Sequence, residues 1–514
     1  MNVLLINPNH NNSKNNFPWG VLSVASYLKH QNKNVKILDL SNYPDDHIGK
    51  LEEDTDWANV VGIGAFSSDV PAVKNLVDTI KLKYPSMPII CGGPHVVLEP
   101  KTTCEYNNID FICYGEGERT FDLLIDELNK EQSNLSDVPG IMYKNSDKVV
   151  KTIPSHHVEA YDINYELLHQ NVIKTFGDYI QVLTSRGCSY RCTFCYNPVI
   201  NQQFRPRAAG MMVNEIDKVV EKYNPEVIYF RDENFFQEKD RIYDFIKLYK
   251  EQGYSFKWRS TCRASYVRDY FVSDNILSEL EEINCQTLKF GLESGSQRVL
   301  NWMKKGYKVS WSKDAVKRIY KSKINGNFSF LMGLPTETYD EYVKTLDFVK
   351  YIIDLDRNFE LVGPQYFRFF PGGDIYNEVV KKYDFIKRPE SSEEYDEAFL
   401  NDLLGIYTDM DYPWIPEKAK YTAQFSDLLV YIYKMKLKEL FHYKRIPLLP
   451  WFILARIRFK FSWYSYLYDF YVLSKIHKFF IDVFGRYFFT INEDKTVRWW
   501  MLPFLTVEEQ EMEE

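Results

Sequence analysis

Short apolar runs alternate with amphipathic, helix-forming segments over most of this chain, and this alternation constrains the fold more than any other feature. The apolar runs lie at residues 3–6, 35–38, 60–65, 89–91, 111–113, 179–183, 227–230, 256–260, 287–291, 328–332 and 361–367. Strands that alternate with helices at this spacing form parallel sheets with helices packed on their faces. The sequence therefore predicts an α/β protein.

The runs fall into two groups, which predict two domains. The first five runs predict a doubly wound, Rossmann-like sheet over residues 1–140. The last six predict six βα units over residues 175–372, which form a partial (β/α)6 barrel because a closed TIM barrel has eight. We expect residues 141–174 to be a linker and residues 373–514 to form a mainly helical C-terminal domain.

The composition is that of a globular protein, with 45% hydrophobic residues, 26% charged residues and a net charge of −8. These values exclude a disordered chain and a general nucleic-acid binder held by bulk positive charge. The 8 cysteines are too few for a disulfide scaffold in a chain of 514 residues. The chain shows neither a secretory signal nor an apolar run long enough to span a bilayer. We therefore expect a cytoplasmic protein with no nucleic-acid partner.

Three cysteines stand close together in the segment TSRGCSYRCTFCYNP, at Cys188, Cys192 and Cys195. The segment follows a predicted strand, so the cysteines lie in a loop at the carboxyl end of that strand. Three thiolates can bind three corners of a [4Fe–4S] cube, which normally takes four. The fourth iron would then be open to chelation by an amino and a carboxylate group. The alternative is a zinc site completed by Cys262 and Cys285, although zinc normally takes two close pairs of ligands and these two are far apart in the chain.

The spacing of the three cysteines, with Phe194 just before the last one, resembles the signature of radical S-adenosylmethionine (SAM) enzymes. This resemblance implies that Cys188, Cys192 and Cys195 ligate a [4Fe–4S] cluster and that SAM binds the open iron. An electron from the reduced cluster would cleave SAM to methionine and a 5′-deoxyadenosyl radical. We expect an external electron donor, such as flavodoxin or ferredoxin, as a partner.

Other segments at the ends of the predicted barrel strands also resemble this family. RDENFF resembles the acidic segment that receives the SAM amino group, GLESGS resembles the family's GxESGS segment, and MGLPTET resembles its GLPxET turn beside adenine. FRFFPGGDIY resembles its sixth-strand segment, but Gly373 stands where threonine is usual. The residues expected to contact SAM are Phe194, Asp232, Glu233, Arg263, Glu293, Ser294 and Gly333.

Two of these expectations have structural alternatives. Asp232 and Glu233 would also suit the N-terminal cap of a helix, where acidic side chains meet free N–H groups. Arg263 has the bidentate guanidinium that suits the SAM carboxylate, but an ordinary surface ion pair would use it equally well.

The loops that follow the first five runs are rich in glycine, which turns alone would explain. However, the segments FPWGVLSVASYL, CGGPHVVLEP and YGEGERTFDLL resemble the cobalamin-binding domain that precedes many radical SAM domains. The residues expected to bind cobalamin are Trp19, Gly20, Ser67, Ser68, Gly93, Pro94, His95, Gly115, Glu116 and Gly117. Many cobalamin proteins carry Asp-x-His-x-x-Gly after the first strand, with the histidine bound to cobalt. The first loop lacks that pattern, and DDHIG around His47 has its glycine one residue early, so we expect cobalt without a histidine ligand.

The C-terminal region carries no motif for chemistry, but its charge is uneven. Residues 431–480 hold ten Lys or Arg, two acidic residues and sixteen aromatic residues. This mixture suits a helical cap packed on the barrel or a helix at a membrane surface, and nucleic acid is the least favoured partner. We therefore expect a cytoplasmic protein that contacts a membrane peripherally, if at all, through residues 431–480.

Together the two resemblances imply a cobalamin-dependent radical SAM enzyme. We expect it to methylate an unactivated carbon of a hydrophobic or membrane-associated small molecule, through a 5′-deoxyadenosyl radical and methylcobalamin. The alternative is an oxidative, ring-forming enzyme that resembles anaerobic Mg-protoporphyrin monomethyl ester cyclase. A non-enzymatic alternative is a cobalamin-binding sensor with a vestigial barrel, although the intact cysteine triplet and the GLESGS segment count against it.

Overall fold

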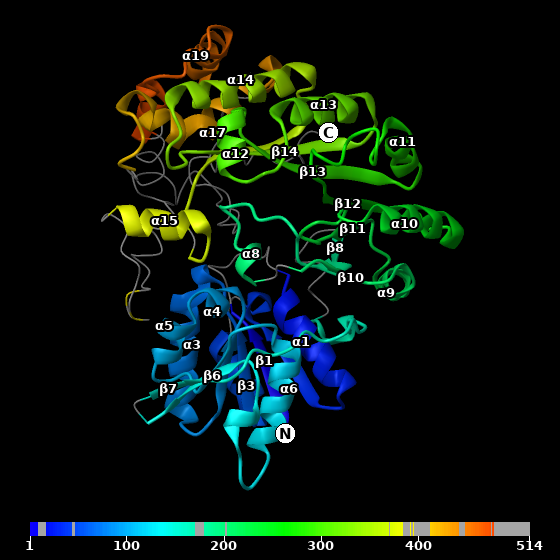
Figure 1. Ribbon diagram of the computed structural model, residues 1–514, viewed down its shortest axis with the longest axis vertical. Coiled ribbons are helices and arrows are strands. Elements are labelled where there is room, and N and C mark those ends of the chain that lie inside the picture. Colours follow the sequence, from blue (N-terminus) through cyan, green and yellow to red (C-terminus); the bar gives the residue numbers. More distant parts are fainter. Residues whose placement is uncertain are drawn as a thin grey trace.

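The computed structural model shows two α/β lobes, with further helices packed on the second lobe (Figure 1). It describes residues 1–8, 17–43, 47–146, 148–169, 179–200, 203–369, 371–383, 391, 394, 412–440, 448–473 and 475–476. The α/β prediction is confirmed, because each lobe is built on a parallel sheet whose strands alternate with helices along the chain.

The first lobe contains a seven-stranded sheet in the order β2-β1-β3-β4-β5-β6-β7. The strands are β1 (Asn2–Asn7), β2 (Asn34–Asp39), β3 (Val60–Gly64), β4 (Ile89–Gly92), β5 (Phe111–Cys113), β6 (Ile141–Asn145) and β7 (Lys148–Lys151). Strands β1 to β5 are parallel, and β6 and β7 run antiparallel at one edge. The strand order reverses between β1 and β3, and ligands of doubly wound sheets bind at such a switch point.

Helices cover both faces of this sheet, and each face has its own apolar core. The helices of this lobe are α1 (Trp19–His30), α2 (His47–Trp57), α3 (Val70–Lys83), α4 (Pro94–Leu98), α5 (Pro100–Glu105) and α6 (Gly117–Leu128). The predicted linker, residues 141–174, begins within the sheet, because its first part forms β6 and β7. Met142 and Val150, on β6 and β7, pack against these cores.

The second lobe contains six parallel strands in the order β8-β11-β12-β13-β14-β15, an open barrel of the predicted kind. These strands are β8 (Tyr179–Val182), β11 (Val227–Phe230), β12 (Lys257–Thr261), β13 (Cys285–Glu293), β14 (Asn325–Met332) and β15 (Glu360–Tyr366). A short hairpin of β9 (Ser185–Arg186) and β10 (Arg205–Pro206) flanks the cysteine loop. The helices are α8 (Asn197–Ile200), α9 (Ala209–Tyr223), α10 (Lys239–Gln252), α11 (Asp274–Glu282), α12 (Gln297–Trp302), α13 (Val309–Lys321) and α14 (Tyr339–Leu355).

The described part of the C-terminal region is helical and packs on the barrel. Its helices are α15 (Asp374–Lys382), α17 (Lys420–Lys434), α18 (Leu437–Leu440) and α19 (Leu449–Lys460). Ser426 on α17 donates a hydrogen bond to Pro364 O on β15 at 3.1 Å. Tyr433 stacks on Phe459 with ring centroids 4.1 Å apart, and both rings belong to the barrel core. These contacts are the ones expected of a helical cap packed on the barrel. Much of residues 373–514 and part of residues 431–480 lie outside the described residues.

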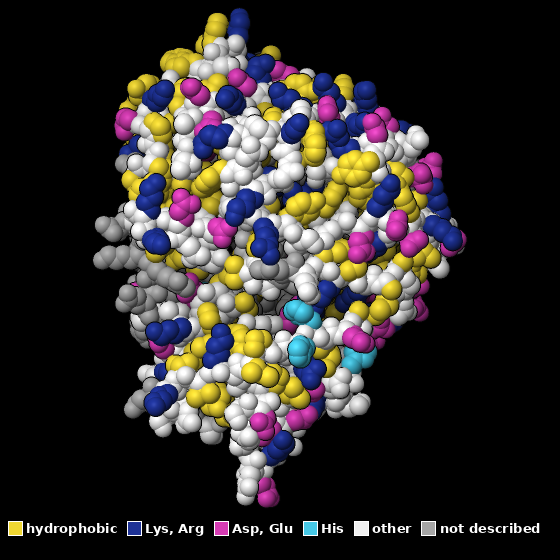
Figure 2. Space-filling view, in the orientation of Figure 1, with side chains coloured by type: hydrophobic (Ala, Val, Ile, Leu, Met, Phe, Trp, Pro, Cys, Tyr) yellow, Lys and Arg dark blue, Asp and Glu magenta, His cyan; other side chains and the backbone are white. Residues whose placement is uncertain are grey.

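The helices in the described part of the chain are all too short or too polar to cross a membrane. On the face shown in Figure 2, basic and acidic side chains are interspersed over both lobes.

Gly62 in β3 has no room for a side chain, because a Cβ there would lie 2.6 Å from both Leu5 Cδ2 and Phe121 Cε2. We predict that Gly62→Ala lowers the free energy of unfolding of the first lobe by about 1–3 kcal/mol, since overpacking forces core side chains off their rotamers. Denaturant unfolding would measure this. Gly210→Ala on α9 is the control, because its Cβ would meet no atom within 4 Å and alanine favours a helix. Equal stability of the two variants would contradict the prediction.

Candidate active site

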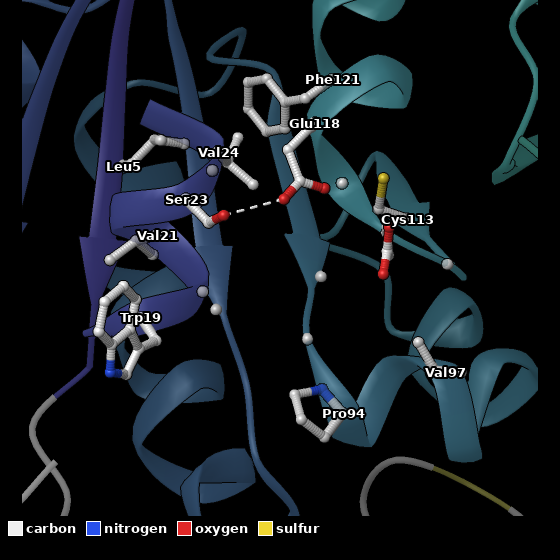
Figure 3. A pocket seen from close by; sticks show the side chains of 18 of the residues that line it. Leu5, Trp19, Val21, Ser23, Val24, Pro94, Val97, Cys113, Glu118 and Phe121 are labelled. Atoms are coloured by element: carbon white, nitrogen blue, oxygen red, sulfur yellow. Dashed lines mark hydrogen bonds between the residues drawn. The ribbon is translucent and has the colours of Figure 1, made fainter. Parts of the chain in front are cut away.

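A cavity opens at the switch point of the first sheet, where the surface is hollowed between the two lobes (Figure 2). The cavity has a volume of about 270 Å³ and is partly open to solvent. Figure 3 shows Trp19, Val21 and Ser23 of α1 on one side of the cavity, opposite Pro94 and Cys113. Its position is the one that the doubly wound topology predicts for a ligand.

Most of the residues expected to bind cobalamin line this cavity. Those in its wall are Trp19, Gly20, Gly93, Pro94, Gly115, Glu116 and Gly117. The other three lie behind it. His95 is buried and hydrogen-bonded to Ser67 at 3.1 Å, and burial lowers the pKa of its imidazole to about 4. Ser68 donates a hydrogen bond to Asp69 at 3.2 Å.

Glycines keep the cavity open. A Cβ at Gly20 or at Gly115 would meet no atom within 4 Å and would project into free space. At Gly93, where φ is +101°, a Cβ would come 2.8 Å from Ala65 O, so only glycine suits this turn. A backbone surface of this kind allows a large, flat ligand to approach closely, and the residues therefore suit a corrinoid.

The second lobe supplies the remaining wall of the cavity, through Leu183, Arg186, Ile200 and Glu233. Of these four residues, only Glu233 was expected at a site, and it was expected to contact SAM. Arg186 and Ile200 flank the cysteine loop, so the cavity of the first lobe and the cysteine loop share a boundary.

Buried charges tie the cysteine loop to the cavity. Arg186, two residues before Cys188, donates to Glu118 Oε1 at 2.6 Å. Glu118 also accepts from Ser23 at 3.0 Å and from Tyr161 at 2.9 Å. Burial alone would raise the pKa of Glu118, but the charge and hydrogen bonds of Arg186 lower it to about 2. The carboxylate therefore stays ionised and holds the loop against the first lobe.

A second ion pair acts beside the first. Arg205 on β10 pairs with Glu116, with Nη1 3.0 Å from Oε2, and His157 Nδ1 lies 2.9 Å from the same oxygen. Both strands of the β9–β10 hairpin are thus fixed to the start of α6 and the turn before it. None of these partners was singled out from the sequence for this purpose, because the pairs join residues that are tens of positions apart.

The cysteine loop is also anchored within its own lobe. Thr193 N donates to Met303 O at 3.1 Å, and Ile375 N donates to Thr193 O at 3.2 Å. Cys192 is buried, while Cys188 and Cys195 are half-buried. Burial raises the pKa of Cys195 to about 11, so cluster binding has to release its proton. Phe194, beside Cys195, packs partly buried against an apolar cluster.

Two cations lie beside Cys192. Arg263 has its Nη1 3.9 Å from Cys192 Sγ, and its guanidinium stacks 3.4 Å above the ring of Tyr190. Lys305 is buried and pairs with Glu293 at 3.1 Å. Lys305 was not predicted as a site residue, since nothing in MKKGY marks it as buried. Only the folded structure brings Lys305 to the GLESGS turn.

Three of the residues expected to contact SAM are engaged by the protein itself. Asp232 is 1% exposed and accepts from Thr184 N at 2.7 Å, from Thr184 Oγ1 at 2.8 Å and from Arg241 at 3.3 Å. Ser294 is buried and lies 3.2 Å from Thr345 Oγ1 on α14. Gly333, at φ +85°, donates to Glu337 at 3.0 Å. Asp232 therefore braces the strand before the cysteine loop, and Glu233 has the carboxylate that faces the cavity.

The zinc alternative finds no support in this arrangement. Cys262 and Cys285 are both buried in the barrel core rather than in the cysteine loop. In the part of the chain that the structure describes, no three His, Cys, Asp or Glu side chains are gathered around a common point for a metal ion. The thiolates that bind a [4Fe–4S] cube can stand farther apart than the ligands of a single metal ion, because each thiolate binds a different iron. Three thiols on one loop with two adjacent cations suit such a cluster, whose three thiolates carry negative charge.

Comparison with known protein families shows to which family the chain belongs. Residues 14–125 match the B12 binding domain and residues 182–349 match the Radical SAM superfamily. An uncharacterized methyltransferase of Pyrococcus horikoshii is 30% identical over 71% of this chain and 78% of its own length. The chain belongs to the cobalamin-dependent radical SAM enzymes. The cofactors of this family are a [4Fe–4S] cluster, SAM and cobalamin, as the sequence analysis expected.

Two further relatives are named for different reactions, one as a methyltransferase and one as a cyclase. Cytidylyl-2-hydroxyethylphosphonate methyltransferase of Streptomyces wedmorensis is 25% identical over 65% of this chain and 73% of its own length. Anaerobic magnesium-protoporphyrin IX monomethyl ester cyclase of Synechocystis is 24% identical over 68% of this chain and 71% of its own length.

Solved structures show the same fold. The cobalamin-dependent SAM radical enzyme OxsB has a TM-score of 0.66 at 20% identity, covering 90% of this chain and 75% of its own. The radical SAM methyltransferase TsrM from Kitasatospora setae has a TM-score of 0.63 at 17% identity, covering 77% and 83%.

Arg186→Met would leave Glu118 buried without its cation. We predict a loss of about 3 kcal/mol in the free energy of unfolding, since an uncompensated buried charge is costly. We also predict faster amide hydrogen exchange at residues 115–118. Arg207→Met is the matched control, because Arg207 pairs with Glu215 inside the second lobe. If both variants change exchange at residues 115–118 equally, the bridge between the lobes is not the cause.

Gly115→Leu would fill part of the cavity without meeting protein atoms near its Cβ. We predict at least about tenfold weaker cobalamin binding, because the added side chain occupies space that the ligand needs. Thermal stability should stay near that of the wild type. Titration of the purified protein with hydroxocobalamin, followed by absorbance, measures the affinity. Unchanged affinity in a folded variant would place the corrinoid elsewhere.

Proposed function

We propose that this enzyme methylates an unactivated carbon of a small molecule. One observation carries the proposal, namely that Arg186 and Ile200, which flank the cysteine loop, form part of the wall of the cobalamin cavity together with Glu233 after β11. When bound, the cluster and SAM supply the radical that removes a hydrogen atom, and methylcobalamin supplies the methyl group. A substrate between them would be exposed to both.

The chain's own residues position and shield this reaction. The Arg186–Glu118 pair fixes the cysteine loop at the cavity, and Arg263 with Lys305 supplies positive charge for the SAM carboxylate. Much of the cavity wall is apolar, including Val21, Val24, Ile90 and Val97, and this excludes water from a reactive carbon radical. We propose a hydrophobic substrate for the same reason.

Cobalt is proposed to lack a histidine ligand. Among the described residues that line the cavity there is no histidine. His95, which was expected to bind cobalamin, is hydrogen-bonded to Ser67 and does not line the cavity, and burial keeps its imidazole neutral by lowering its pKa to about 4.

Two partners belong to the proposal. An external electron donor such as flavodoxin or ferredoxin would reduce the cluster. A membrane surface would meet α19, whose outer face exposes Ile453 at 49%, Ile457 at 39% and, just beyond the helix, Phe461 at 68%. Apolar side chains of this kind beside Lys460 suit an interfacial helix and would place the enzyme near a lipophilic substrate.

Labelled SAM tests methyl transfer. Protein loaded anaerobically with cluster and reduced cobalamin should convert SAM with a trideuterated methyl group into trideuterated methylcobalamin, which mass spectrometry detects. The label should then appear in the product once a substrate is supplied. If cofactor-loaded protein cleaves SAM to 5′-deoxyadenosine without labelling cobalamin, methyl transfer is excluded. The ring-forming reaction is then favoured, to which the similarity to the Synechocystis cyclase points.

Cysteine variants supply the controls for this experiment. Cys192→Ala should lose bound iron and SAM cleavage while keeping cobalamin, because Cys192 does not line the cobalamin cavity, whose wall comes mainly from the first lobe. Cys262→Ala removes a buried cysteine outside the triplet and should keep bound iron, SAM cleavage and cobalamin. Loss of the metal site in Cys262→Ala would instead support a zinc site that uses this residue.

A further inference from the structure

The inner face of the partial barrel carries three cations that no part of the proposed mechanism uses. Arg231 follows β11, Arg259 lies on β12 and Lys289 lies on β13. The alternate residues on these strands, such as Phe230, Trp258 and Phe290, are buried in the core under the outer helices. Because side chains alternate along a strand, the three cations point to the opposite, concave face.

The three side chains lean toward the same corner of the barrel. Lys289 Nζ lies 4.5 Å from the ring centroid of Tyr229, and Arg231 Cζ lies 5.4 Å from the same centroid. Arg259 Cζ lies 5.0 Å from the ring centroid of Tyr179 on β8. Tyr229 is the register partner of Arg259, so all three charges gather over the β8–β11 side of the sheet.

Within the described part of the chain, none of the three forms an ion pair with a carboxylate. Other arginines at this end of the barrel differ, since Arg186, Arg205, Arg207 and Arg241 each meet one. The Nε of Arg259 is buried without a hydrogen-bond partner. Arg231 donates to Tyr229 Oη at 3.2 Å, which leaves its charge uncompensated. Arg259 and Lys289 are half-buried and Arg231 is exposed. Like charges gathered on one concave wall repel one another and attract an anion.

This corner adjoins the cobalamin cavity. Gln181 is the register partner of Tyr229 on β8. Its side-chain oxygen accepts a hydrogen bond from Trp19 Nε1 at 3.3 Å, and Trp19 lines the cavity. An anion held by the three cations would therefore lie next to the place where the reacting carbon is proposed to sit. It would be separate from Arg263 and Lys305, which lie beside Cys192.

We propose that Arg231, Arg259 and Lys289 bind a phosphoryl group of the substrate. This deepens the proposed function and rests on it, because it places one end of the methylated molecule. Two guanidinium groups and an ammonium group carry three positive charges, of which the two negative charges of a phosphoryl group near neutral pH offset two. A carboxylate carries one charge and would leave two cations unmatched. The substrate is thus amphipathic, with an anionic end in the barrel and an apolar end at the cavity.

Binding of inorganic phosphate to the cofactor-loaded protein tests this without turnover. Isothermal titration calorimetry should show phosphate binding that Arg259→Met and Lys289→Met each weaken about tenfold or more, as expected for lost charge-assisted hydrogen bonds. Lys257→Met is the matched control on the same strand. Lys257 pairs with Glu226 at 2.9 Å, so its loss should leave phosphate affinity unchanged.

Several outcomes would overturn the proposal. They are equal phosphate affinity in the wild type and both variants, acetate binding as tight as phosphate binding, and displacement of phosphate by SAM, which would place the anion at Arg263 and Lys305. If either Met variant does not fold, Arg259→Lys and Lys289→Arg keep the charges and should retain phosphate binding, whereas Arg259→Gln should lose it. Since no methyl transfer is measured, a failed labelling experiment would not alter this result.

Discussion

The buried pair of Arg186 and Glu118 is the interaction on which the arrangement of this enzyme depends. One partner stands two residues before the first cysteine of the cluster loop, and the other lies in the first turn of α6, in the wall of the cobalamin cavity. Glu118 has almost no contact with water, so its charge is satisfied only while Arg186, Ser23 and Tyr161 remain in place. Separation of the lobes would leave a buried carboxylate without its cation, which is strongly unfavourable. The Arg186–Glu118 ion pair therefore holds the two cofactor sites at a fixed distance.

Positive charge is distributed over the second lobe according to what it has to meet. Arg186, Arg205 and Arg207 meet carboxylates of the protein and serve structure. Arg263 and Lys305 stand beside a cysteine loop that becomes anionic when a cluster binds. Arg231, Arg259 and Lys289 meet aromatic rings and no carboxylate of the described chain. This gradation separates the cations that hold the fold from those that await a ligand.

The C-terminal helices extend the barrel instead of standing apart from it. Helix α17 lies along β15, the last strand of an open sheet, and its apolar residues join the barrel core. An uncovered strand at this position would expose a row of backbone groups and apolar side chains. The aromatic residues that made this region ambiguous in the sequence are therefore partly accounted for by packing. Those on the outer face of α19 remain exposed.

Local patterns in the sequence were enough for the two parallel sheets, the open barrel and the cysteine loop. Each of these depends on residues that are close together in the chain, such as Cys188, Cys192 and Cys195, or on the period of apolar residues within one strand. The cavity glycines were found for the same reason, since they follow the strands directly. The antiparallel edge formed by β6 and β7 was not predicted. The alternation of apolar and polar residues in these two strands is short, and the first sheet was expected to end with the strand at residues 111–113.

Tertiary structure alone decided which charged residues serve which purpose. Asp232 and Glu233 are neighbours in the sequence, yet the first is enclosed by Thr184 and Arg241 while the second faces the cavity. Lys305 reaches Glu293, and Arg186 reaches Glu118, only after strands and loops far apart in the chain have come together. The role of a charge is set by its partners and its access to water, and both are properties of the folded chain.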